Sequence, residues 1–236
     1  FQSPHPPGQS NLQPPISNLQ PPISSLQSPI SNLQSFDAVA LFCLQAQRVR
    51  GEFSLLENEA PHVLRLCRLV EGTPLALELA AGWLRALSYA EVERSLDFLS
   101  SSLRHAPARH RSMRAVFEQS WQMLSGPEQA AFGRLSLFKG GFQQEAAGVV
   151  ARADLPSLVN LVDKSLLRLT PSGRYQVHEL LRQFAAEKLL LEANSSQASQ
   201  QPEAALVAWQ RYSSYYLNLV AQREASLRGN APRPAL

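Results

Sequence analysis

The chain has 236 residues and 44% hydrophobic content, which suits one or two globular domains with a sizeable core. Its net charge of +3 at pH 7 permits an acidic partner but does not single out nucleic acid as that partner. No apolar run reaches the roughly 18 residues that cross a bilayer, and the first residues lack the pattern of a signal peptide. We therefore expect a soluble, cytoplasmic protein with no membrane partner.

A proline-rich heptad repeat occupies residues 1–35. The unit SNLQPPI stands at 10–16, is repeated without change at 17–23, and returns in altered form at 24–30. Proline breaks helices and removes ladder donors, so these copies predict neither a coiled coil nor a strand. We expect 1–35 to be a disordered linker.

Residues 36–103 predict a small helical bundle. Apolar residues recur at spacings of three and four over 36–50 and 58–70, and Ser88 to Glu91 forms a capping box at the start of a helix that runs to about 99. Cys43 and Cys67 lie on the apolar faces, without the spacing of a zinc site, and are expected to be buried free thiols.

The segment 72–77, GTPLAL, ends one helix of this bundle and begins the next. Gly72 suits the left-handed C′ position, Thr73 suits an N-cap, and Pro74 suits the first turn, where its missing N–H has no cost. The following helix, 75–87, is apolar nearly all round, so its one acid, Glu78, is expected to need a partner. Local chemistry alone describes this corner as a well-capped core helix.

Residues 104–192 predict a winged-helix domain. Ser112 is expected to cap an amphipathic helix, and a capping box at 125–128 to start another that carries Phe138 and ends at 140–141. The basic stretch before Ser112 suits either a solvated linker or contact with phosphates. Short helices follow at 143–151 and 155–164, the latter with its apolar stripe at Leu155, Leu158, Val159 and Val162.

Two extended pieces, 165–169 and 174–177, flank a turn with proline and glycine and predict a β-hairpin, which a helix from His178 to about 191 follows. Helices followed by a hairpin are the order of a winged helix. Residues 193–201 read as a linker. In the last segment, 202–236, aromatic residues align along a helix that has no evident partner within the chain and is the expected start of tetratricopeptide-like repeats. The predicted fold class is thus mainly α.

Residues 36–192 resemble the STAND class of signal-transducing ATPases, which includes NB-ARC proteins and bacterial transcriptional activators. The resemblance rests on segment 72–77, on RHRSMR at 109–114, on LSLFKGGF at 135–142, on LVDKSLL at 161–167 and on YQVHELL at 175–181. In that class a P-loop domain precedes a helical domain, a winged helix and helical repeats.

The resemblance implies a nucleotide site that includes Gly72, Pro74, Leu75 and His178. Pro74 would stand for the family proline that packs beside adenine, and His178 for the histidine that reaches the β-phosphate of ADP. His178 follows a strand at the start of a helix, where free N–H groups favour an anion. Taken without the family pattern, a histidine in this place is more often a surface or capping residue.

The chain departs from the family in one respect, because no G-x-x-x-x-G-K-[ST] and no acidic magnesium site occur in it. We expect no enzyme activity of its own and no metal site, but an ADP/ATP-sensing regulatory part that needs a P-loop NTPase domain, upstream or in trans, with helical repeats downstream. The alternatives are a winged-helix nucleic-acid-binding module and a helical scaffold for protein partners. Direct DNA contact is not expected, since the recognition helix at 155–164 has Lys164 as its base, with Asp154 and Asp163 as acids beside it.

Overall fold

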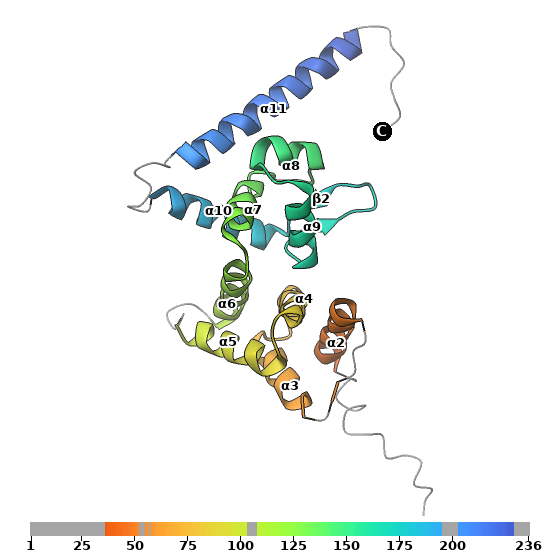
Figure 1. Ribbon diagram of the computed structural model, residues 1–236, viewed down its shortest axis with the longest axis vertical. Helices are drawn as coiled ribbons and strands as arrows, with labels where there is room; N and C mark the ends of the chain where they lie inside the picture. The colour runs from red at the N-terminus through yellow and green to blue at the C-terminus, as the bar shows by residue number, and fades with distance from the viewer. Residues whose placement is uncertain (1–35, 52–54, 57, 103–107, 195–202, 229–236) are drawn as a thin grey trace, which may run out of the picture.

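The computed structural model describes residues 36–51, 55–56, 58–102, 108–194 and 203–228, and this part of the chain is mainly helical with one two-stranded sheet (Figure 1). The predicted linkers at 1–35 and 193–201 lie wholly or mostly outside the described residues. Within the described ranges, no helix combines the length and apolar character that crossing a bilayer requires.

The first unit is the helical region for which the sequence predicts a small bundle. It consists of α2 (Asp37–Arg50), α3 (Ala60–Leu69), α4 (Pro74–Gly82), the 3-10 turn η2 (Trp83–Arg85) and α5 (Tyr89–Ser102). Helix α2 packs on α4, and α3 packs on α5. The capping box that begins α5 is confirmed, because the Ser88 N–H donates to Glu91 Oε2 at 2.7 Å and the Glu91 N–H donates to Ser88 Oγ at 3.4 Å. Cys43 and Cys67 are buried and free, as predicted.

The helix predicted at 75–87 is shorter than expected, since α4 ends at Gly82. Two tertiary contacts explain the early end. The Arg50 side chain donates to the carbonyl oxygens of Leu84 at 2.8 Å and Leu87 at 3.2 Å, and Trp83 Nε1 donates to Ser120 Oγ at 3.2 Å. The Arg50 bonds satisfy two backbone carbonyls after Gly82 that a continuing α-helix would otherwise pair, and the Trp83 bond fixes the side chain that follows the helix.

The second unit contains α6 (Ala108–Gln122), α7 (Gly126–Leu135), α8 (Gln144–Ala151) and α9 (Leu155–Asp163), followed by β1 (Arg168–Leu169), β2 (Tyr175–Gln176) and α10 (Glu179–Asn194). The predicted hairpin is confirmed as an antiparallel pair in which Arg168 faces Gln176. The capping box at Ser125 and Glu128 is confirmed as well.

Three local predictions in this unit are wrong. Ser112 does not cap a helix, because α6 begins at Ala108 and Ser112 is buried within it. Phe138 lies beyond the end of α7 at Leu135. The stripe predicted for α9 is turned, since Leu158 and Leu161 are buried whereas Leu155 and Val159 are each 47% exposed. The spacing of apolar residues fits both faces of this helix, and packing against α7 selects one of them.

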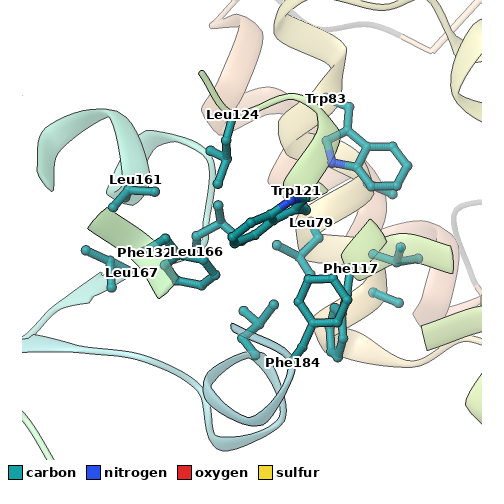
Figure 2. Close-up of a cluster of buried hydrophobic side chains, with 14 of the residues drawn as sticks. Leu79, Trp83, Phe117, Trp121, Leu124, Phe132, Leu161, Leu166, Leu167 and Phe184 are labelled. Atoms are coloured by element: carbon teal, nitrogen blue, oxygen red, sulfur yellow. The ribbon is translucent and has the colours of Figure 1, made fainter. Parts of the chain in front are cut away.

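The two units share one hydrophobic core, which Figure 2 shows in close-up. Trp83 and Leu79 of the bundle lie beside α6 of the second unit, and α6 contacts α5 and α4. On its other side α6 packs against α10 through aromatic rings. The ring centroids of Trp121 and Phe184 lie 6.2 Å apart. Helix α6 therefore joins the bundle to the hairpin unit.

Helix α11 (Glu203–Arg228) has a partner within the chain, contrary to the sequence-based expectation. It lies across α8 and α10 (Figure 1). Ala208 is fully buried there, and the rings of Tyr212 and Tyr216 lie 5.5 and 6.4 Å from the ring of Phe138. The sequence pattern missed this contact because it joins segments that are far apart along the chain.

Candidate functional site

The corner between α3 and α4 is a Schellman motif. The Gly72 N–H donates to the Cys67 carbonyl at 2.9 Å, and the Glu71 N–H donates to the Arg68 carbonyl at 3.0 Å. This pattern places Glu71 at C′, with φ at 52°, so the prediction that Gly72 fills C′ is wrong by one residue. Gly72 takes the next position and is also left-handed, with φ at 64°.

Pro74 is the first residue of α4, as predicted, and it is exposed. Thr73 precedes it with extended backbone but makes no side-chain capping bond, contrary to expectation. The corner thus presents an exposed proline and, one residue later, the half-buried Leu75.

His178 lies between β2 and α10 and is exposed. Its carbonyl accepts from the Arg182 N–H at 2.9 Å, and its Nδ1 accepts from the Leu180 N–H at 3.3 Å. A ring nitrogen that accepts carries no proton, so the neutral imidazole has its proton on Nε2. His178 is therefore a helix-capping residue whose Nε2–H is available as a donor.

A cleft of about 610 Å³ lies between the bundle and the hairpin unit and is lined by residues of both. Leu75 and His178 both line it, although they are far apart in the sequence. Gly72 and Pro74 are not among its lining residues, and Pro74 adjoins it through Leu75. The remaining lining residues come from both units: Arg48, Glu78, Val162, Ser165, Leu166, Leu167, Arg168, Leu169, Gln176 and Val177.

The charged groups of this cleft favour an anionic ligand. Arg48 is exposed, and its Nη1 donates to the neutral Gln45 Oε1 at 3.3 Å. Arg168 is exposed at the start of the hairpin. Glu78 is half-buried and makes no ion pair within the described part of the chain. Two guanidinium groups and the His178 donor therefore oppose one carboxylate.

Sequence reasoning did not assign Arg48 and Arg168 to the site. Arg48 lies on α2, and the STAND-like segment 161–167 ends just before Arg168. Neither residue therefore belongs to a segment that carries the family resemblance. Glu78 was expected to need a partner, and within the described part of the chain it lines the cleft without an ion pair. The described residues contain no group of three His, Cys, Asp or Glu side chains suited to a metal ion.

A second cleft, of about 430 Å³, also includes a residue of this corner. Thr73 lines it together with Met113, Phe117 and other residues of α6 and α10. Arg114 and Glu187 form a bidentate pair at its wall, with N–O distances of 2.6 and 2.9 Å. These hydrogen bonds hold the pKa of the Glu187 carboxyl below its usual value.

The proposed recognition helix α9 offers little to nucleic acid. Lys164, which follows it, directs its Nζ to Glu128 Oε2 and Oε1 at 2.9 and 3.0 Å. Asp163 pairs with Arg85 at 3.1 Å. The exposed side chains near its start, Leu155 and Val159, are apolar, so α9 lacks the free basic groups that bind phosphates.

Comparisons with known proteins reveal relatives but no matching family model. The chain is 36% identical over 167 residues to Mycobacterium tuberculosis Rv0890c, whose name describes it provisionally as an HTH-type transcriptional regulator. It is 34% identical over 168 residues to the uncharacterized protein Rv0894 of the same species. It is also 27% identical over 164 residues to the disease resistance protein RPS4 of Arabidopsis thaliana.

Each match covers about two thirds of this chain (65%, 65% and 66%) but only 19%, 43% and 12% of the respective relative. The chain thus spans less than half the length of the curated relatives that it matches. The relatives with a functional name are a transcriptional regulator and a disease resistance protein. Their names suggest a regulatory role for this chain.

Proposed function

We propose that this chain is the nucleotide-sensing regulatory part of a STAND-type signalling or transcription-regulating protein, and that it is not catalytic by itself. The observation that carries this proposal is the cleft shared by Leu75 and His178. The resemblance to the STAND class implies, independently of the cleft, that both residues belong to one nucleotide site.

In the proposed complex, ADP lies between the bundle and the hairpin unit. Its phosphates approach the His178 Nε2–H, the first N–H groups of α10 and the guanidinium of Arg48, while its base lies beside Pro74 and Leu75. A P-loop NTPase domain, upstream or in trans, would supply the phosphate cradle and the magnesium site that this chain lacks.

Bound ADP would then hold the units in one arrangement, and exchange for ATP would release them. Such a switch requires only that the two nucleotides bind the two arrangements with different affinity. In this reading residues 104–192 form the winged helix, which the order of helices, hairpin and helix supports.

The two alternative functions differ in their support. The pairing of Lys164 with Glu128 weighs against DNA binding through α9. The scaffold function has one observation in its favour, because an apolar face of α11 stays exposed although the helix packs on α8. Its exposed residues are Leu206, Trp209, Leu217 and Val220, and helical repeats that continue the chain would cover them.

Nuclear magnetic resonance of the full chain tests the nucleotide site, because the sequence has only five histidines whose ring signals need to be assigned. The chain alone lacks the phosphate cradle, so we expect ADP to shift the His178 signal with a dissociation constant of about 1 mM. An added P-loop domain should tighten that binding.

The variant His178→Asn is the sharpest probe, because asparagine also caps a helix but has no group in the place of Nε2–H. We expect it to weaken ADP binding about tenfold, the loss of one hydrogen bond to a charged group. Equal ADP affinity in wild type and His178→Asn, measured with the P-loop domain present, would refute the proposed site.

A further inference from the structure

Glu78 holds an unusual place on α4. The helix is otherwise apolar, and its neighbours Leu77 and Leu79 are fully buried. Glu78 is half-buried, opens into the cleft, and has no ion-pair partner within the described part of the chain. A partly buried carboxylate that lines a cleft without an ion pair can act on a charged ligand that enters it.

The cleft is lined by charged groups of both signs. Arg48, Arg168 and His178 provide donors for an anion, and Glu78 lines the same cavity without an ion pair to any of them within the described part of the chain. Its negative charge therefore stays uncompensated by a salt bridge. This charge repels any anion that enters the cleft, and the repulsion grows with the negative charge of that anion.

We propose that Glu78 biases this cleft against nucleoside triphosphates relative to nucleoside diphosphates. The inference rests on the proposed nucleotide site and adds the group that discriminates between the two ligands. A triphosphate brings one further negative charge than a diphosphate. At a separation of about 10 Å and an effective dielectric constant of about 20, the Glu78 carboxylate repels this additional charge. The repulsion lowers the affinity for the triphosphate about tenfold relative to the diphosphate.

The test compares ADP and ATP on the full chain, without divalent cations, by following the His178 ring signal. The wild-type ratio of the ATP to the ADP dissociation constant is the reference. Glu78→Gln keeps the size and polarity of the side chain but removes its charge, so this ratio should fall about tenfold. Glu145→Gln, a matched control, removes the same charge from an exposed position on α8 outside this cleft and should leave the ratio unchanged.

The outcomes separate the two proposals. If both nucleotides bind and Glu78→Gln keeps the wild-type ratio, the role of Glu78 is refuted while the nucleotide site stands. A fall in the ratio that Glu145→Gln reproduces also refutes it, because net charge then explains the effect. If neither nucleotide shifts the His178 signal, and a P-loop domain does not restore binding, the nucleotide site itself is wrong and the inference fails with it.

Discussion

Lys164 joins three parts of the second unit through one ammonium group. Its Nζ donates to both oxygens of Glu128 at 2.9 and 3.0 Å and to the Met123 carbonyl at 3.3 Å. Glu128 is only 7% exposed and also accepts from the Ser125 N–H in the capping box of α7. Burial raises the pKa of this carboxyl, but the hydrogen bonds from Lys164 and Ser125 outweigh burial and leave the pKa below its usual value.

We expect Glu128→Gln to lower the free energy of unfolding by about 2 kcal/mol at pH 7, because it leaves the Lys164 ammonium without its counter-charge. The effect should lie below that of a wholly buried pair, since the Lys164 side chain is 33% exposed. Urea unfolding measures it. The double variant Glu128→Gln, Lys164→Met should recover part of the loss, and no recovery would show that the pair is not coupled.

The same carboxyl predicts a dependence on pH. Its pKa is lower in the folded than in the unfolded chain, so its contribution is present above the unfolded pKa and is lost as the pH falls through the folded one. The stability difference between wild type and Glu128→Gln should therefore shrink between pH 7 and pH 3. A difference that stays constant over this range would contradict the assigned role of the charge.

At the scale of the element, helix α11 shows how far the sequence pattern reaches. Its helical character follows from local spacing, but its partners α8 and α10 do not, since only the tertiary fold sets the contact of Tyr212 with Phe138. Helix α9 gives the same lesson, because its length was predicted and its buried face was not. Capping boxes and the hairpin were predictable because their bonds join residues only a few positions apart.

The candidate site was predictable to a similar degree. Family resemblance assigned Leu75 and His178, and the cleft that joins them needed the structure. Arg48 and Arg168 were missed because their place in the cleft depends on how α2 and the hairpin meet. The left-handed Glu71 was missed because sequence preference assigns such a position to the adjacent glycine.

We expect Ala208→Glu to release α11 from the second unit, because Ala208 is fully buried against it and a carboxylate there would be desolvated without a partner. Hydrogen exchange measures the result as loss of protection in α11, while α2 to α5 keep theirs. Leu217→Glu, on the same helix at a position that is 70% exposed, should leave protection unchanged. Equal loss in both variants would mean that the helix is destabilised by the charge and not by lost packing.

At the scale of the whole molecule, the bundle and the hairpin unit meet at two places, a shared core and a shared cleft. They share the core around α6, with the bond from Trp83 to Ser120 and the ion pair from Arg85 to Asp163 across it. They also share the cleft, whose walls come from α2 and α4 on one side and from the hairpin and the start of α10 on the other. A ligand that fills this cleft contacts both units at once.

The proposed site therefore predicts that ADP stabilises both units together. At ten times its dissociation constant, a ligand that binds only the folded state adds about 1.4 kcal/mol to the free energy of unfolding. Hydrogen exchange with ADP should slow in α2 and α4 and equally in the hairpin and α10, and His178→Asn at the same ADP concentration should show a smaller change in all four. Slowing confined to the hairpin and α10 would show that the nucleotide binds one wall only, because a ligand held between two walls cannot protect one of them and leave the other as it was.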